Sequence, residues 1–398
     1  MKKNIKSTVL QVLPKIPFDL SNGGDIAIFG MTKALKKLNY NIDWIGFDHE
    51  STENDDVNKK KNMIRKLIKI RSNKMNSNLF DYIISLFQPY PYLIWKYKSD
   101  EYQSQLDSLL KQNKYDVVQF EHINSTLFAF DIKKKTDAKI ILRAHSLNTN
   151  HYKNLFHLEN NYFKKIVYFI EYRKYKYYEH KIFNLFDIVL YITEEEKNYF
   201  LDRKNNFKSF VIPLALDKKP KKYKSKDGRL NLLWSGDLPI MQHRRSIEIF
   251  IKEIFPSLYA IWPNLIFNVV GKSPNRNLLS LETESIKFFG FQKNIGDFYL
   301  NSDVFIAPLY AGNGLKVKIV NALLNGLPVI TTPIGAEGFG KLKDNYMFIC
   351  NSKIDFINSI KTVNNNKRKT DEMVTSGQQY IENTMNMNSI IKKLEKIY

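Results

Sequence analysis

A glycine-rich turn followed by two lysines is the part of the sequence best suited to bind a charged ligand. Gly312 and Gly314 lie between a short apolar run and a helical pattern, and Lys316 and Lys318 follow at once. Backbone N–H groups at the start of a helix are unpaired and carry the positive end of the helix dipole, so they can bind a diphosphate. Glycines also occur at such turns for steric reasons alone, and the motif by itself does not decide between the two explanations.

Two segments in the first half of the chain also have residues that could contact a ligand after a predicted strand. Gly23 and Gly24 follow the first apolar run and precede a helical pattern, so the main chain can approach a ligand there. His145 follows the strand predicted over 139–143. Ligands of open parallel sheets bind beyond the carboxyl ends of the strands, whereas a histidine in a loop can also be satisfied by the backbone alone.

Two sets of strands must position these residues. Short apolar runs alternate with longer amphipathic stretches, which is typical of parallel sheets covered by helices on both faces. The runs lie at 9–14, 42–47, 117–120, 139–143, 188–192 and 211–213, and then at 231–235, 265–270, 286–289, 304–307, 328–331 and 346–350. The sequence therefore predicts an α/β fold with two Rossmann-like domains.

The length of 398 residues also indicates two domains, because a single core rarely supports so long a chain. A polar, lysine-rich stretch after the run at 211–213 separates the two sets of strands. We place the N-terminal Rossmann-like domain at 1–215, the linker at 216–229, the C-terminal Rossmann-like domain at 230–380 and a closing helix at 381–398.

Composition limits the class of protein and its compartment. The only cysteine is Cys350, so neither an internal disulfide nor a cysteine metal cluster can form, which suits a reducing cytoplasm. Neither a secretory signal pattern nor a run of about 18 apolar residues is evident. We therefore expect a cytoplasmic protein.

The net charge of +21 favours anionic partners. Nucleic acid, an anionic membrane face and a phosphorylated substrate all fit, and charge alone does not choose between them. An AT-rich genome, which encodes lysine and asparagine readily, would also give part of this excess of positive charge without functional meaning. The basic stretch 59–71 carries apolar residues at helical spacing, which predicts either a helix at a membrane surface or an ordinary packed surface helix.

The segment 303–338 resembles the donor site of retaining nucleotide-sugar glycosyltransferases of the GT-B fold, in particular the large family 4 group. The residues that match are Gly312, Gly314, Lys316, Lys318, Gly326, Pro328, Val329 and Thr331, and the match extends over 335–338. The segment around His145 is similar to an Arg-x-His-Asn segment of the same group, with Ser146 in place of the asparagine. Gly23 and Gly24 resemble its Gly-Gly loop. The resemblance implies two Rossmann-like domains whose parallel sheets face each other across a cleft.

The resemblance also implies roles for individual residues. His145 and Lys318 are the catalytic candidates. The candidates for donor binding are Gly23, Gly24, Gly236, Arg244, Arg245, Gly312, Asn313, Gly314, Leu315, Lys316 and Asn321. No Asp-x-Asp motif follows a strand, so we expect no catalytic metal and no cofactor, the nucleoside diphosphate sugar being a substrate.

Asn313 and Asn321 depart from the family pattern, which has a glutamate at each of these places. Loss of the first glutamate is usual in this branch, but the second normally binds the ribose of the nucleotide. An asparagine can still hydrogen-bond ribose hydroxyls, although more weakly than a carboxylate. Reduced affinity, a different donor and lost activity are all consistent with this change.

The implied function is a hexosyltransferase that moves a sugar, with retention, to the hydroxyl of a glycan or lipid-linked acceptor. Synthesis of a cell-surface polysaccharide at the inner membrane face is the setting we expect. The alternative is a glycosyltransferase-like protein that binds a sugar nucleotide or a partner without turnover. Nucleic-acid binding has only the net charge in its favour, because no nucleic-acid motif accompanies it, and we do not expect it.

Overall fold

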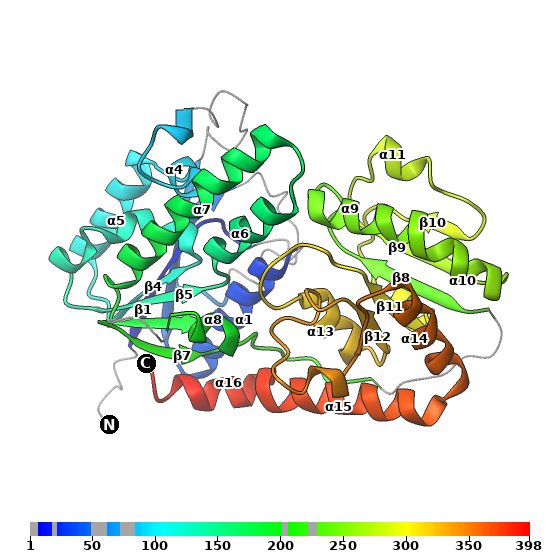
Figure 1. Cartoon of the computed structure of the whole chain (residues 1–398). Coiled ribbons are helices and arrows are strands. Elements are labelled where there is room, and N and C mark those ends of the chain that lie inside the picture. Colours follow the sequence, from blue (N-terminus) through cyan, green and yellow to red (C-terminus); the bar gives the residue numbers. More distant parts are fainter. Residues whose placement is uncertain (1–6, 18–21, 49–61, 72–83, 201–205, 222–228) are drawn as a thin grey trace. The chain divides into compact units, whose positions relative to one another are not determined.

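The computed structural model describes residues 7–17, 22–48, 62–71, 84–200, 206–221 and 229–398 (Figure 1). The chain forms two compact units. Unit 1 contains residues 1–216 and 385–398, and unit 2 contains residues 217–384. The last fourteen residues therefore return to unit 1, although the chain has passed through unit 2.

Unit 1 contains a seven-stranded parallel sheet in the order β3-β2-β1-β4-β5-β6-β7. Its strands are β1 Thr8–Leu13, β2 Asn41–Asp48, β3 Lys66–Arg71, β4 Val117–Glu121, β5 Lys139–Ala144, β6 Ile188–Tyr191 and β7 Lys208–Val211. In the central register, Val9 of β1 pairs with Ile42 on one side and with Val117 on the other. Because the central strands are covered on both faces, they are buried and largely apolar, and the exceptions include Gln11, Gln119, Glu121 and Arg143.

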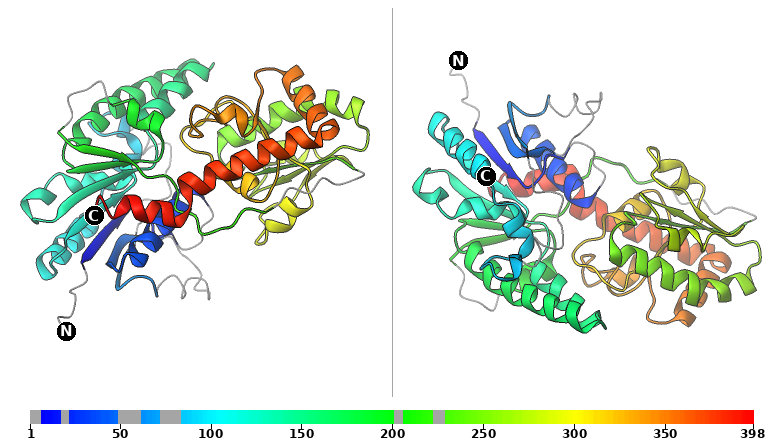
Figure 2. Two further views of the ribbon diagram at one scale, coloured as in Figure 1. Left: turned by 90° about the horizontal axis from the view of Figure 1, so that it is seen from below. Right: turned by 90° about the horizontal axis from the view of Figure 1, so that it is seen from above.

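Helices cover both faces of the unit 1 sheet, and the alternation of side chains along β1 divides the core in two. Val9 and Leu13 contact the core beneath α1 and α16, and Leu10 and Val12 contact the core beneath α5, α6 and α7. Figure 2 shows α16 beside α1 within this unit. The helices are α1 Gly23–Lys37, α4 Tyr92–Lys96, α5 Asp100–Gln112, α6 Asn148–Leu158, α7 Tyr162–Phe183, α8 Glu194–Asn198 and α16 Met387–Leu394, with 3-10 turns at Ile123–Ala129 and Ile132–Lys134.

Unit 2 is built on a six-stranded parallel sheet in the order β10-β9-β8-β11-β12-β13. Its strands are β8 Asn231–Ser235, β9 Ile266–Val270, β10 Ile286–Phe288, β11 Val304–Ala307, β12 Val329–Thr331 and β13 Phe348–Ile349. The helices are α9 Met241–Ile249, α10 Phe255–Ile261, α11 Arg276–Leu279, α12 Gly296–Leu300, α13 Val317–Leu324, α14 Lys353–Asn365 and α15 Lys367–Met385, with a π-helical turn at Phe250–Ile254 and a 3-10 turn at Lys343–Asn345. The sequence prediction of two parallel α/β domains is confirmed.

The helix predicted over 59–71 is wrong for the part that is described, 62–71, and residues 59–61 lie outside the described residues. Lys66–Arg71 form the edge strand β3, parallel to β2, and the Arg65 guanidinium donates two hydrogen bonds to Asp43. Ile68 and Ile70 contact one core, whereas Leu67 contacts the other. Because β3 has apolar side chains on both faces, the spacing of its apolar residues also fits a helix.

Two other elements differ from the sequence prediction in extent. The last strand of unit 1 lies at Lys208–Val211 and not at 211–213. The C-terminal helical stretch is divided into α15 and α16, because Asn386 between them is extended and caps α16 by accepting a hydrogen bond from the N–H of Asn388. None of the helices in the described ranges is long and apolar enough to cross a membrane.

Candidate functional site

The loop between β11 and α13 in unit 2 has a conformation that requires glycine. Gly314 has φ 67°, which places it in the left-handed region that other residues rarely adopt. The Lys316 ammonium donates a hydrogen bond of 2.5 Å to the Gly314 carbonyl and lies 3.6 Å from the Glu337 carboxylate. Lys316 is also the N-cap of α13 and makes no side-chain capping bond, so the cap leaves the first N–H groups of this helix without a side-chain partner.

Lys318, in the first turn of α13, carries a buried cation. Its Nζ lies 4.5 Å from the centroid of the Trp234 ring and has no hydrogen-bond partner among the described residues. Burial, followed by the repulsion of Lys316, lowers the pKa of Lys318 to about 7. At Gly236, a Cβ atom would lie 2.8 Å from this Nζ, so the ammonium sits directly against the turn that follows β8.

His243 of α9 is a second side chain beside Trp234. The two ring centroids are 5.8 Å apart, and His243 Nδ1 lies 2.8 Å from the Asp237 carbonyl oxygen. Burial and then the charge of Lys318 lower the pKa of His243 to about 3, so this ring is neutral at physiological pH. A neutral ring that donates from Nδ1 to the carbonyl keeps Nε2 as an acceptor. The positive charge of this site therefore comes from its lysines.

The remaining candidates in unit 2 lie on α9, in the loop before α13, and on α13 itself. Arg244 is half-buried and Arg245 is exposed, and neither side chain makes a hydrogen bond or ion pair within the described part of the chain. Asn313 and Leu315 are half-buried in the loop between β11 and α13. Asn321 is half-buried one turn after Lys318, and its backbone carbonyl accepts hydrogen bonds from Asn325.

The base of the loop is fixed by β12 and the turn after it. The Thr331 hydroxyl donates to the Ala307 carbonyl at 2.7 Å, and the Thr332 hydroxyl donates to the Leu309 carbonyl. The Gly335 N–H donates to the Thr332 hydroxyl at 3.3 Å. These bonds connect the end of β11 to residues 331–335, which belong to the segment that resembles a donor site.

Gly335→Ala is expected to lower stability, because a Cβ atom there would lie 1.9 Å from Thr331 Oγ1. Such overpacking costs roughly 1–3 kcal/mol, which corresponds to a fall in Tm of about 2–4 °C per kcal/mol for a domain of this size. Differential scanning calorimetry measures the change. Gly296→Ala is the matched control, because its Cβ would come no closer than 3.1 Å to any neighbour. Equal effects of the two substitutions would contradict the prediction.

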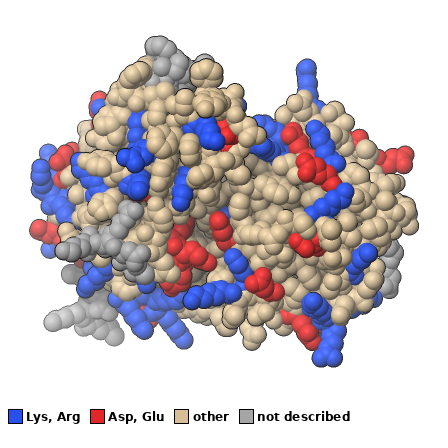
Figure 3. All heavy atoms as spheres, viewed as in Figure 1, with Lys and Arg blue, Asp and Glu red and all other residues tan. Residues whose placement is uncertain are grey.

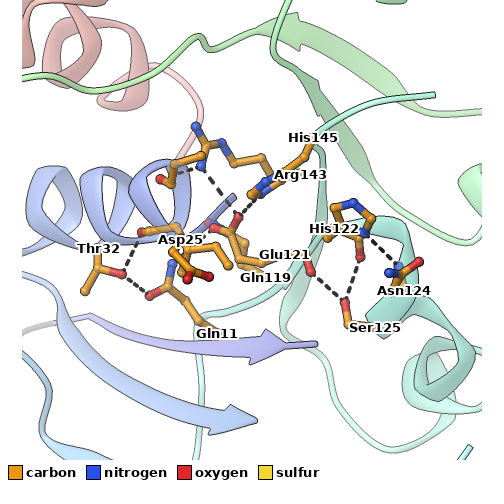
Figure 4. A network of polar contacts seen from close by, with 12 residues as sticks. Gln11, Asp25, Thr32, Gln119, Glu121, His122, Asn124, Ser125, Arg143 and His145 are labelled. Atoms are coloured by element: carbon orange, nitrogen blue, oxygen red, sulfur yellow. Dashed lines mark hydrogen bonds and ion pairs between the residues drawn. The ribbon is translucent and has the colours of Figure 1, made fainter. Parts of the chain in front are cut away.

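A second polar site lies in unit 1, where the carboxyl ends of β4 and β5 meet (Figure 4). Glu121 is completely buried, and its Oε2 lies 2.6 Å from His145 Nε2 and 3.5 Å from Arg143 Nη1. Its Oε1 accepts hydrogen bonds from the amides of Gln119 and Gln11. Burial alone would raise the pKa of Glu121, but Arg143, His145 and Gln119 outweigh it and the pKa is lowered.

Arg143 connects this carboxylate to the rest of the unit. The side chain is fully buried, and it donates to the carbonyl of Ala27 in α1 at 2.8 Å and to the carbonyl of Pro213 at 3.2 Å. Its charge faces that of Glu121. A guanidinium suits this place, because its planar array of donors can serve two carbonyls and a carboxylate together.

His145 is held by Glu121 in one tautomer. Burial is the main reason that the pKa of His145 is lowered, so the ring is neutral, and Nε2 must carry the proton that it donates to Glu121. Nδ1 is then an acceptor. It would lie 4.0 Å from a Cβ atom at Gly24, which places this acceptor at the first turn of α1, where Asn22 caps the helix.

His122 lies next to His145, with ring centroids 5.5 Å apart. Burial is the main reason that the pKa of His122 is lowered to about 3, and the neighbouring imidazole of His145 would oppose a second positive charge there. Its Nδ1 accepts from the N–H of Asn124, which leaves the proton on Nε2. Its φ of 68° is rare for a residue with a side chain, and such conformations are frequent at functional sites.

The structure brings together part of the predicted site within each unit. In unit 2, Gly236 and Lys318 are in contact, and Lys316 closes the loop that contains Gly314. In unit 1, Gly23 and Gly24 begin α1, and Gly24 lies beside His145.

The sequence reasoning missed four residues of these sites, namely Glu121, His122, Trp234 and His243. Glu121 and His122 follow directly after the predicted strand 117–120, and that position was an available signal. The pairing of Trp234 with Lys318 joins distant parts of the chain, and no local pattern indicates it. Within the described ranges, no group of three or more His, Cys, Asp or Glu side chains is placed to bind a metal ion.

Comparisons with known proteins show which family and which folds this chain is similar to. Residues 229–366 match the family described as Glycosyl transferases group 1. Over 403 residues, covering 98% of this chain and 99% of the relative, the sequence is 25% identical to an uncharacterised 44.6 kDa protein in the cps region of Klebsiella pneumoniae.

Solved structures show the same fold over nearly the whole chain. Sucrose-phosphate synthase from Thermosynechococcus elongatus has a TM-score of 0.69 at 13% identity, with 99% of this chain and 98% of that chain covered. Anabaena HepE, in a complex with UDP and glucose, has a TM-score of 0.67 at 11% identity, with 98% and 99% covered. The fold is therefore GT-B, its second unit contains a group 1 glycosyltransferase domain, and the chain is a glycosyltransferase.

Proposed function

We propose that this chain is a hexosyltransferase that moves a sugar from a nucleoside diphosphate sugar, with retention, to the hydroxyl of a glycan or lipid-linked acceptor. The observation that carries the proposal is the buried ammonium of Lys318, which lies against the Gly236 turn without a hydrogen-bond partner among the described residues. A buried cation without a hydrogen-bonded acceptor is costly. The charge of Asp237 attracts Lys318 but is outweighed by burial and by Lys316, so the site favours a ligand that supplies negative charge.

The donor diphosphate is the ligand that fits this site. Lys316 and Lys318 supply positive charge, and the backbone amides of 312–315 and the start of α13 supply donors. Because Gly236 has no side chain, the Lys318 ammonium can approach the turn after β8 closely, and Arg244 and Arg245 on α9 are further candidates for the diphosphate. Anabaena HepE, which shares the fold, was solved with UDP and glucose, and this supports a nucleotide sugar as the ligand class.

The nucleotide end of the donor is assigned to the side chains of Asn313 and Asn321. Asn321 lies one turn after Lys318 on α13, at the place of the glutamate that binds ribose in the resembling family. Its amide can both donate to and accept from ribose hydroxyls. The bond is weaker than one to a carboxylate, so this donor site is expected to bind nucleotide less tightly than a glutamate-containing site.

The reaction breaks the bond between the anomeric carbon and the diphosphate oxygen, and forms a bond to the acceptor oxygen. Negative charge builds up on the leaving diphosphate, and Lys316, Lys318 and the loop amides stabilise it. The acceptor hydroxyl gives its proton to the leaving phosphate oxygen, and retention follows when both bonds lie on the same face of the sugar. Because the lysines can neutralise this charge, the proposed reaction needs neither a catalytic metal nor another cofactor.

In unit 1, His145 and His122 are suited to orient a sugar. The neutral rings present an acceptor at His145 Nδ1 and a donor at His122 Nε2, so together they can bind a hydroxyl group in a defined orientation. Glu121 fixes the tautomer of His145. The first turn of α1, with Gly23 and Gly24, provides backbone donors beside them.

The setting that we propose is synthesis of a cell-surface polysaccharide, in the cytoplasm or at the inner membrane face. The relative from Klebsiella pneumoniae is named as a protein in the cps region, which supports a role with polysaccharides. The net charge of +21 suits a diphosphate and lipid headgroups as partners, and nucleic acid is not a partner in this proposal.

A screen of nucleoside diphosphate sugars tests the proposal. We expect at least one donor to raise the Tm and then to give a product with a mixture of glycan and lipid-linked acceptors, and Asn321→Glu to increase nucleotide affinity by roughly 5- to 20-fold, the gain from a charge-assisted hydrogen bond. Isothermal calorimetry measures the affinity. The matched control is Asn358→Glu, which adds the same charge to the exposed face of α14.

The outcomes separate an enzyme from a binding protein. Binding of a donor without product, in all acceptor mixtures and also in Asn321→Glu, would favour a glycosyltransferase-like protein that only holds a sugar nucleotide. If no nucleotide sugar shifts the Tm, the donor site at Lys318 is wrongly assigned.

A further inference from the structure

The outer surface of α7, with the end of α6, exposes large apolar side chains. Tyr162 and Phe163 are 81% and 82% exposed, Tyr177 is 69% exposed, and Ile166 is 52% exposed. Ile166 lies one turn after Tyr162, and Tyr177 lies three turns after Ile166, so the three are on one side of the helix. We call these residues, together with Phe163, the α7 stripe. Removing such side chains from contact with water is favourable, so an exposed set of this size indicates an interaction surface.

A second segment adds to the same side of unit 1. Lys174 of α7 donates a hydrogen bond of 2.6 Å to the Ser85 carbonyl, and Phe87, two residues further on, is 85% exposed. At the end of α6, Leu158 is 43% exposed. Exposed apolar side chains therefore also occur on two segments that neighbour α7.

The charges of α7 are divided between its two faces. Both acidic residues point inward and are fully buried. Glu171 accepts from the Tyr92 N–H at 2.9 Å, and Glu179 accepts from the Asn148 N–H at 2.7 Å. The exposed charges are basic and include Lys164, Arg173 and Lys176. Figure 3 views α7 from the side on which it lies in front in Figure 1, and mainly uncharged and basic atoms cover this region.

One acidic residue near the stripe is not fully buried. Glu159, at the C-cap of α6, is half-buried, and its carboxylate accepts the backbone N–H groups of Asn160 and Asn161. These two hydrogen bonds partly compensate the negative charge of Glu159 and stabilise the turn between α6 and α7. The outward surface of the helix retains an excess of positive charge among its aromatic side chains.

We infer that the α7 stripe is the surface by which this protein lies on an anionic lipid bilayer. Tyrosine and phenylalanine are favourable at the boundary between headgroups and acyl chains, and lysine and arginine beside them contact anionic headgroups. The inference deepens the proposed function and rests on it, because a lipid-linked acceptor would be reached at such a surface.

Charge complementarity favours a bilayer over a second copy of this chain. A symmetric dimer through the α7 stripe would place the same surface on both sides of the interface. Arg173 and Lys176 of both copies would then be brought together, and the exposed charges described on α7 include no acid to compensate them. A bilayer with anionic lipids supplies the missing negative charge, and the chain as a whole carries +21.

Sedimentation of the full chain with lipid vesicles tests the inference. Vesicles of phosphatidylcholine alone are compared with vesicles in which roughly a third of the lipid is phosphatidylglycerol. We expect binding to the anionic vesicles that weakens as salt is added. Arg173→Gln with Lys176→Gln should weaken it by on the order of fivefold for each residue, and replacing Tyr162, Phe163 and Ile166 by serine should weaken it at least tenfold.

Matched controls lie in unit 2. Phe291, Leu342 and Ile354 are 63%, 62% and 66% exposed, so replacing these three by serine removes a similar apolar surface elsewhere. Lys353→Gln with Lys361→Gln removes the same charge from the exposed surface of α14. Both controls should bind vesicles as the parent protein does. Circular dichroism and the Tm show whether each variant is folded.

The inference is overturned if the parent protein does not bind anionic vesicles, if it binds neutral vesicles equally well, or if the α7 variants bind like their controls. A dimer that the α7 variants break, found by analytical ultracentrifugation without vesicle binding, would also overturn it. Donor binding is measured on the same samples. Loss of vesicle binding with donor binding intact counts against the membrane surface alone, and vesicle binding without any donor counts against the proposed function alone.

Discussion

Replacing Lys318 with Met is expected to lower kcat by a factor on the order of 10²–10³ and, at the same time, to raise the Tm. The loss of activity follows because the substitution removes the cation that would stabilise the leaving diphosphate. The gain in stability follows because the ammonium is buried against Trp234 and has no hydrogen-bond partner among the described residues. A fall in kcat together with a rise in Tm would show that the charge of Lys318 stabilises the bound ligand and destabilises the fold.

The gain in stability from Lys318→Met should depend on pH. The pKa of Lys318 is about 7 in the folded chain, whereas the ordinary pKa of a lysine is 10.5, so the unfolded chain binds more protons between these two values. The stability of the parent protein should therefore rise with pH through this window. The advantage of Lys318→Met is greatest below pH 7 and disappears above 10.5. Thermal melts of both proteins over this range measure it.

Donor affinity should change with pH in the opposite direction. A bound diphosphate favours the charged form of Lys318, so affinity for a nucleotide sugar falls as the pH rises above about 7, by at most tenfold per pH unit. A nucleotide sugar is the right probe, because its diphosphate does not titrate near neutral pH. Calorimetry should give a flat profile for Lys318→Met. The exposed Lys341→Met is the control and should keep the slope of the parent protein. A parent protein with a flat profile would contradict the assignment.

Most of the fold, but less of the site, could be predicted from the sequence. The strands at Asn231–Ser235 and Val304–Ala307 were predicted with the bounds that the structure gives, because buried parallel strands are short apolar runs bounded by turn residues. At Lys66–Arg71 the same kind of run was interpreted as a helix. An edge strand with lysines on it is not distinguished from a basic helix by its periodicity over so few residues.

The site is harder to predict because its properties arise from contacts between distant residues. The motif around Gly314 indicated an anion site, but the buried state of the Lys318 ammonium depends on Trp234 and Gly236, which belong to another strand and the turn after it. In the same way, His145 was identified from its position after a strand. Its neutral state and tautomer depend on burial and on Glu121, neither of which local sequence reveals.

Glu121→Gln is expected to have the largest effect on stability, a loss of roughly 3–5 kcal/mol, because it leaves the charge of Arg143 buried without its partner. The pKa of Glu121 is lowered in the folded chain, so its ionised carboxylate stabilises the fold above the ordinary pKa of 4.5, and this stabilisation is lost as the pH falls through the folded value. Urea unfolding at pH 7 and below pH 4 measures this. The difference between parent and variant should shrink at the lower pH, and a constant difference would contradict the prediction.

The same carboxylate is expected to act on turnover only through His145. A glutamine oxygen at position 121 can still accept the proton of His145 Nε2, so Glu121→Gln should lower kcat less than His145→Ala when both are measured below their melting temperatures. The double variant decides the role of Glu121. If Glu121 only positions His145, then Glu121→Gln combined with His145→Ala has the same kcat as His145→Ala alone, while the loss of stability from Glu121→Gln remains. A further loss of kcat in the double variant would mean that Glu121 contacts the substrate itself.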